Sequence, residues 1–121
     1  MTTLSDAYTL RIFIGSTDQF HHQSLYEYLV FEAKKQGLAG ATVVKGLMSF
    51  GASSIIHSYK FWELSDKVPV VVEIVDEEAK VKKYYDSVRE LLETMKYGCF
   101  VTWDKTNVLL YKPGTKRIFN I

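Results

Sequence analysis

The chain has 121 residues, of which 47% are hydrophobic and 24% are charged, and its formal net charge is +1 at pH 7. This composition is typical of a globular domain and excludes a disordered chain, which combines low hydrophobicity with high net charge. Because acidic and basic residues are mixed along the sequence, no general field attracts nucleic acid or anionic lipid, and we expect neither a nucleic-acid partner nor direct membrane insertion.

The first part of the chain predicts a strand, a helix and a second strand. Residues 8–14 alternate in polarity, which indicates a strand with one better-buried face. Apolar residues spaced by three and four over residues 23–36 predict a helix that ends before Gly37. Residues 41–47 are rich in β-branched side chains and predict the second strand.

The middle of the chain predicts a third strand and a second helix. The third strand is strongest over residues 69–75 and can extend back over residues 59–64, and its proline is expected at an edge or at the start of the strand. Asp76 is expected to cap the second helix, whose apolar stripe runs from residue 81 to residue 95. Gly98 is expected to end that helix.

The last part of the chain predicts two more strand segments. They cover residues 99–103 and 108–111, on either side of a turn at residues 104–107. We expect a single domain over residues 1–121, in which residues 113–121 form a tail.

Strand, helix, strand, strand, helix and strand is the order of the ferredoxin-like β-α-β-β-α-β fold. In this α+β sandwich two helices cover one face of a four-stranded antiparallel sheet. The open face is expected to carry Val71, Glu73 and Val75, and a closed oligomer is the simplest way to cover it. Glu73 is an acidic residue in an apolar setting, and we expect it to pair with Arg11 or with a lysine.

Four sequence segments together point to a known family. They are GLAGATVVKG at residues 37–46, SFGA at 49–52, IHS at 56–58 and LSDKVPVVVEIVD at 64–76. With these segments the chain resembles the uncharacterised PII-like family called domain of unknown function 190. More widely it is similar to PII signalling proteins, in which a lysine-glycine pair ends the second strand and a proline-containing third strand runs into an E-I-V segment.

The resemblance implies a homotrimer that binds an adenine nucleotide (ATP, ADP or AMP) in clefts between subunits. Such a protein reports nucleotide occupancy to a transporter, channel or enzyme. Lys45 and Gly46 occupy places comparable to those of the PII lysine-glycine pair. The loop at residues 47–58 is shorter than the PII signalling loop, and the PII phosphate loop is reduced here to residues 96–99, so phosphate contacts are expected to be distributed differently.

The predicted nucleotide site centres on the loop at residues 49–54. This loop is rich in small residues and hydroxyls, so its main-chain N–H groups can wrap a phosphate, although it does not match the P-loop pattern. Lys45 and Lys60 bracket the loop and can neutralise phosphate charge, and His57 can hydrogen-bond a ligand. The candidate nucleotide-binding residues are Lys45, Gly46, Phe50, Gly51, Ala52, Ser53, Ser54, His57, Lys60 and Gly98.

Simpler interpretations stay open for these residues. The loop can be an ordinary connection between strands, the lysines can be solvated edge residues, and His57 can be a packed, hydrogen-bonded side chain. Two other functions also stay open: a nucleotide-independent trimeric interaction protein that docks on a membrane transporter, and a weak hydrolase that uses Ser54 and His57.

The sequence gives little reason to expect catalysis or a metal. No G-x-S-x-G elbow surrounds either candidate serine and no acid is placed to orient His57, so we expect the protein not to be an enzyme. His21 and His22 lack nearby cysteine or paired carboxylate partners, and no metal is predicted. Cys99 is the single cysteine in the sequence, so no intramolecular disulfide can form, and we expect this residue to act as an apolar filler. The sequence shows no signal-peptide pattern, and we expect a cytoplasmic protein.

Overall fold

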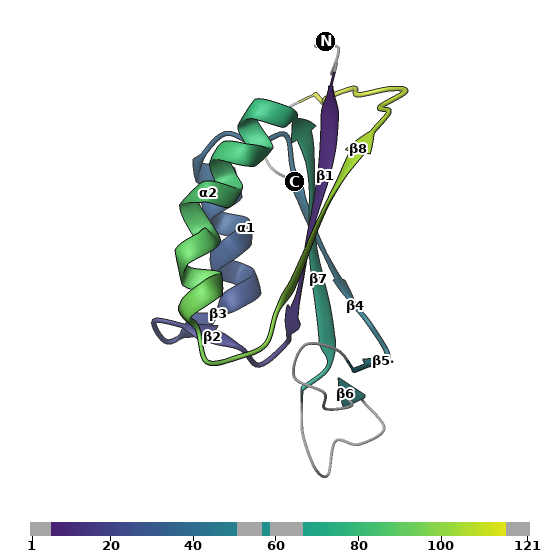
Figure 1. Ribbon diagram of the computed structural model, residues 1–121. Helices are drawn as coiled ribbons and strands as arrows, with labels where there is room; N and C mark the ends of the chain where they lie inside the picture. Colours follow the sequence, from purple (N-terminus) through teal and green to yellow (C-terminus); the bar gives the residue numbers. More distant parts are fainter. Residues whose placement is uncertain (1–5, 51–56, 59–66, 116–121) are drawn as a thin grey trace.

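The computed structural model describes residues 6–50, 57–58 and 67–115. Two helices cover one face of a twisted four-stranded sheet (Figure 1). The strand order is β4-β7-β1-β8, and neighbouring strands are antiparallel. The elements of this sandwich are β1 (Ala7–Gly15), α1 (Leu25–Lys35), β4 (Ala41–Lys45), β7 (Pro69–Glu77), α2 (Glu78–Thr94) and β8 (Phe100–Thr106). The predicted ferredoxin-like fold is confirmed.

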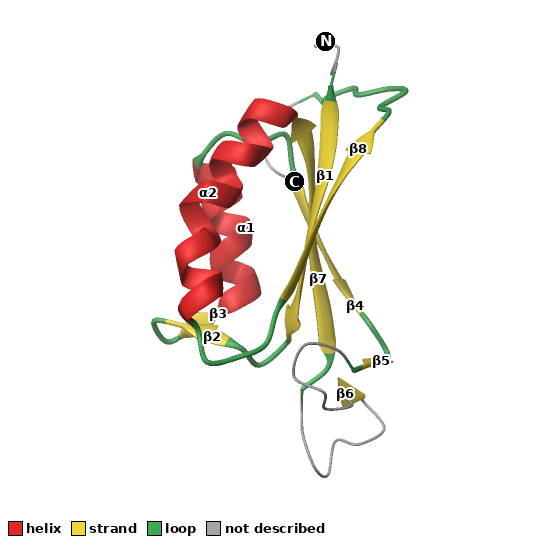
Figure 2. Cartoon of the chain, viewed as in Figure 1, coloured by secondary structure: helices red, strands yellow, loops and turns green. Residues whose placement is uncertain are grey.

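Two short ribbons accompany the main sheet (Figure 2). In the first, β2 (Gln19–Phe20) pairs with β3 (Gln23–Ser24) just before α1. In the second, β5 (Met48–Ser49) pairs with β6 (His57–Ser58) beyond the end of β4.

The core lies between the sheet and the two helices. The central strands supply alternating buried residues because every second side chain faces the helices. These residues pack against Leu29 of α1 and against Val81, Tyr84 and Val88 of α2, all of which are at most 1% exposed. Each such aliphatic side chain stabilises the fold by roughly 1.5–3 kcal/mol. Among the described residues, no helix is both long and apolar enough to span a membrane.

The first helix and the second strand are shorter than predicted. The helix begins at Leu25, not at residue 23, because Gln23–Ser24 pairs with β2 across a tight turn in which His21 and His22 have φ values of 50° and 67°. The second strand ends at Lys45, not at residue 47. One further backbone bond, from the N–H of Gly46 to the carbonyl of Pro69 (2.8 Å), closes the pairing there.

Both predicted ends of the second helix are wrong. Asp76 is the buried penultimate residue of β7, and the N-cap residue is Glu77, which makes no side-chain capping bond. The Asp76 carboxylate instead accepts hydrogen bonds from the N–H groups of Ala39 (2.8 Å) and Glu77 (2.7 Å). At the other end, the helix stops at Thr94 because Met95 is already extended, before the chain reaches Gly98.

The predicted strand at residues 99–103 is present, but the turn and the second segment predicted after it are wrong. A single strand, β8, runs through the expected turn, because β1 offers pairing partners along its length from Phe13, opposite Phe100, to Ala7, opposite Thr106. Residues 107–111 then lie beyond the end of β1, and none of them is in a strand.

The open face of the sheet carries an apolar row beside a charged row. The register aligns Val44, Val71, Phe13 and Phe100 across all four strands, and directly opposite residues point to the same side of a sheet. Val44 and Phe100 are 52% and 58% exposed. In the next row on this face, Arg11 Nε donates to Glu73 Oε2 at 2.8 Å, as predicted.

Candidate functional site

The predicted nucleotide-binding residues that the structure describes lie at one end of the sheet. Lys45 is the last residue of β4, and Gly46 follows it. Phe50 follows β5, and His57 begins β6, where it pairs with Ser49. The other residues of the predicted loop site lie outside the described residues; they are Gly51, Ala52, Ser53, Ser54 and Lys60.

The start of this loop is shaped by a close backbone approach. The N–H of Gly46 donates to the carbonyl of Pro69, and a β-carbon on Gly46 would lie 2.8 Å from Cγ of the proline ring. Lys45 is exposed, and Phe50 leaves 72% of its surface in solvent. A cation and an aromatic ring are therefore both accessible here to a ligand or to a second chain.

Gly98 lies at the same end of the sheet but at its opposite edge. It precedes β8, whereas Lys45 ends β4, and the strand order places β7 and β1 between them. Three inter-strand spacings amount to about 14 Å. A single chain therefore does not bring Lys45 and Gly98 together into one phosphate-sized site.

A buried ion pair lies at this end of the sheet and was not predicted. Nζ of Lys67 is 2.6 Å from Oδ1 of Asp18, whose side chain is fully buried. The other carboxylate oxygen, Oδ2, accepts the N–H of Gly15 at 2.8 Å. The pair fixes the start of β7 to the turn after β1, and two hydrogen bonds between Ser16 and Val68 (2.9 and 3.0 Å) do the same.

Two lysines that were not predicted as site residues meet at Tyr97, in the turn between α2 and β8. Nζ of Lys67 lies 4.9 Å from the centre of the Tyr97 ring, and Nζ of Lys96 lies 5.3 Å from the same ring. Lys96 is exposed and directly precedes Tyr97 and Gly98. A lysine two residues before a glycine in a short turn was the available sequence signal, whereas the approach of Lys67 depends on the fold.

Cys99 lies beside this turn in a protected environment. Burial, and then the negative charge of Asp18, raise the pKa of the Cys99 thiol. Its Sγ is 3.7 Å from the carbonyl oxygen of Leu92. A neutral, half-buried thiol is a poor nucleophile, which agrees with its expected role as an apolar filler. In the described part of the chain, no three His, Cys, Asp or Glu side chains gather where they could hold a metal ion.

Residues 7–108 match the family DUF190, described as Uncharacterized ACR, COG1993. The chain belongs to this family. Among the relatives of this DUF190 protein, a UPF0166 protein of Aquifex aeolicus is 39% identical over 80 residues, which are 66% of this chain and 76% of the relative. A UPF0166 protein of Methanocaldococcus jannaschii is 28% identical over 84 residues, which are 69% of this chain and 77% of the relative.

Solved structures with the same fold include CPII, a nitrogen regulatory PII-like protein from Thiomonas intermedia K12. CPII bound to ADP, AMP and acetate has a TM-score of 0.62 and 15% identity, and the match covers 88% of this DUF190 chain and 92% of CPII. CPII bound to ADP, AMP and bicarbonate has a TM-score of 0.59 and 16% identity, with 86% and 91% covered. At this identity the likeness establishes the PII-like fold.

Proposed function

We propose that this DUF190 protein is a PII-like regulator that binds an adenine nucleotide in clefts between the subunits of a homotrimer. Nucleotide occupancy is communicated to a partner such as a transporter, a channel or an enzyme, and the regulator itself catalyses no reaction. The protein works in the cytoplasm, where ATP, ADP and AMP are available.

The observation that carries this proposal is the division of cationic groups between two edges of the sheet. Lys45 lies at the β4 edge, and Lys96 lies beside Gly98 at the β8 edge, at the same end of the molecule. A cleft between two chains can use one edge from each, so both lysines can reach the same phosphate chain. Ammonium-phosphate hydrogen bonds are charge-assisted and are among the stronger polar contacts.

The open sheet face favours assembly. Its apolar row, Val44, Val71, Phe13 and Phe100, is continuous across the sheet, and Phe13 and Phe100 contact each other with ring centres 5.5 Å apart. Contiguous exposed apolar surface of this kind is typical of interaction sites. A closed ring of identical subunits buries this apolar row in every subunit and leaves none of the rows exposed.

The fold likeness to CPII favours an adenine nucleotide as the ligand. The CPII structures are described with ADP and AMP bound. Nucleotide binding that differs in strength between two conformations of the protein would change the surface offered to a partner, since a ligand shifts an equilibrium only by its differential affinity. The alternative function is a trimer that docks on a membrane transporter without nucleotide.

Isothermal titration calorimetry with ATP, ADP and AMP tests the proposal. We expect at least one nucleotide to bind, and we expect Lys45→Ala and Lys96→Ala each to weaken binding roughly tenfold, as the loss of a charge-assisted contact does. Lys35→Ala, which removes an exposed lysine from α1, is the matched control and should bind like the wild type. Three flat titrations on the trimer would exclude nucleotide sensing and leave the nucleotide-independent alternative.

A further inference from the structure

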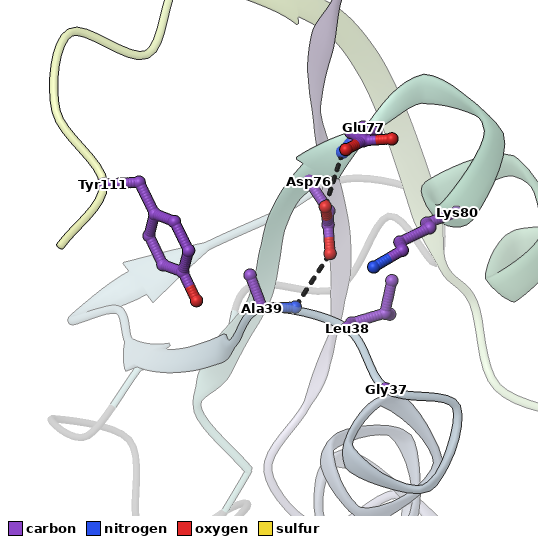
Figure 3. A pocket seen from close by; sticks show the side chains of 7 residues that line it. All are labelled: Gly37, Leu38, Ala39, Asp76, Glu77, Lys80 and Tyr111. Atoms are coloured by element: carbon purple, nitrogen blue, oxygen red, sulfur yellow. Dashed lines mark hydrogen bonds between the residues drawn. The ribbon is translucent and has the colours of Figure 1, made fainter. Parts of the chain in front are cut away.

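A hollow of about 250 Å³ lies at the other end of the sheet from Lys45 and Gly98. It is formed by the turn between α1 and β4, the junction of β7 with α2, and the segment after β8 (Figure 3). Asp76 at this end is seven residues along β7 from Pro69, or about 23 Å. The hollow is therefore separate from the proposed nucleotide cleft.

The floor of the hollow is held rigidly by a buried carboxylate. Asp76 is 1% exposed, and its two oxygens accept the N–H groups of Ala39 and Glu77. The N–H groups of Gly37 and Leu38 are bonded to carbonyls at the end of α1 at 3.0 and 3.1 Å. Each oxygen of an ionised carboxylate has a further lone pair, so Asp76 can accept another hydrogen bond from a ligand without losing its fixed position.

The rim of the hollow carries donors from two different elements. In Figure 3 Lys80 and Tyr111 lie on opposite sides of Asp76 and Ala39, with the ammonium group of Lys80 on the Asp76 side and the hydroxyl of Tyr111 on the Ala39 side. Neither polar end has a hydrogen-bond or ion-pair partner within the described residues. Gly37, with φ at 79°, borders open space, since a β-carbon there would meet no atom within 4 Å.

These groups fit a ligand that has a negative and a positive end. Lys80 and Tyr111 donate, which suits a carboxylate, while Asp76 and Glu77 accept, which suits an ammonium group. A cavity of about 150 Å³ holds benzene, so the volume of this hollow suits a molecule of roughly ten non-hydrogen atoms. We propose that the hollow binds a small zwitterion of the α-amino acid class, with its carboxylate at Lys80 and its ammonium at Asp76 and Glu77.

Calorimetric or NMR titration of the whole protein with the α-amino acids, each up to about 10 mM, tests this assignment. At least one should bind, and Lys80→Met should weaken it roughly tenfold while Tyr111→Phe should weaken it about fivefold. Lys82→Met is the matched control, because it removes an exposed lysine about 200° around α2 and should leave binding unchanged. Ethylamine and acetate, which each supply one charged end, should bind more weakly than the amino acid.

The assignment is overturned if no amino acid binds, if Lys80→Met binds as tightly as the wild type, or if acetate alone binds as well as the amino acid. Nucleotide titration of Lys80→Met separates the two sites. Because the hollow is at the other end of the sheet, this variant should bind nucleotide like the wild type, and loss of both ligands together would contradict an independent site.

Discussion

The side chain of Lys67 crosses Gly15 so closely that a β-carbon on Gly15 would lie 1.8 Å from Cε of the lysine. The end of that lysine is tied to buried Asp18, so its stem has little freedom to move aside. Gly15→Ala should therefore destabilise the protein by about 1–3 kcal/mol, the usual cost of inserting a methyl group into a packed site. Urea unfolding followed by far-UV circular dichroism measures this change.

A double-mutant cycle identifies Lys67 as the cause. In a Lys67→Ala background the obstructing stem is absent, and Gly15→Ala should then cost much less than it does in the wild type. Residues in contact show such non-additivity. An equal cost in both backgrounds would mean that the glycine is needed for another reason.

Loss of the Lys67 charge should also destabilise the protein, because the buried Asp18 carboxylate loses its ion-pair partner. Lys67→Met keeps much of the side-chain volume but leaves a buried carboxylate without its cation, which typically costs about 3–5 kcal/mol. Adding Asp18→Asn to Lys67→Met removes the unpaired charge and should restore part of the stability. If the double variant is no more stable than Lys67→Met, the ion pair is not the source of the loss.

The sequence predicted the features that repeat locally and missed those that depend on distant partners. Alternation in β1 and the three- and four-residue spacing in α2 identify the core, and Glu73 on the open face pairs with Arg11, one of the partners expected for it. Asp76 has the local pattern of a helix cap, yet Ala39, far away in the sequence, binds its carboxylate within the fold.

Two other errors have the same origin. Residues 104–107 look like a turn, but β1 provides partners that keep Asp104 and Thr106 in a strand. The contact of Lys67 with Asp18 joins two irregular segments with no periodic signal in either. For the same reason, the sequence could nominate Lys45 and Gly98 but could not show that they lie on opposite edges of the sheet.

Tyr84 should make stability fall at high pH. Burial, followed by the charges of Glu32 and Tyr28, raises the pKa of Tyr84 well above its usual value, and its hydroxyl donates to the carbonyl of Leu29 at 2.8 Å. Above about pH 10 the unfolded chain loses this proton while the folded chain keeps it, so the unfolded state binds fewer protons and folding stability falls as pH rises.

Unfolding free energies at pH 8, 9.5 and 11 measure this dependence. The contribution of Tyr84 is fully present below about pH 10 and should fall by up to about 1.4 kcal/mol per pH unit above it. Tyr84→Phe should be less stable at pH 8 but should show a shallower decline, since the other tyrosines remain as an internal control. Identical slopes in the two proteins would show that Tyr84 ionises equally in both states.

A charge in the apolar row of the open face should prevent assembly. Phe100 is 58% exposed in the single chain and contacts Phe13, so Phe100→Asp leaves the core intact but places a carboxylate where the proposed subunit contact is apolar. Sedimentation equilibrium should change from a trimer to a monomer. Leu109→Asp, at a residue that is 97% exposed and outside the sheet, is the control and should remain a trimer. A Phe100→Asp protein that still forms trimers would place the subunit contact elsewhere.

If each nucleotide cleft takes Lys45 from one subunit and Lys96 from the next, then mixing the two weakened variants should restore some tight sites. Lys45→Ala and Lys96→Ala trimers each lack one lysine in every cleft. After co-refolding in equal amounts, a cleft is intact when a Lys96→Ala subunit supplies its Lys45 and a Lys45→Ala subunit supplies its Lys96. Random assembly in a closed ring gives this arrangement in about a quarter of the clefts. The measurement is tight-site stoichiometry by calorimetry before and after mixing, with a Lys45→Ala/Lys96→Ala double variant mixed with itself as the control. If both lysines instead served a site within one chain, every cleft in the mixture would still lack one of them and no tight site would appear.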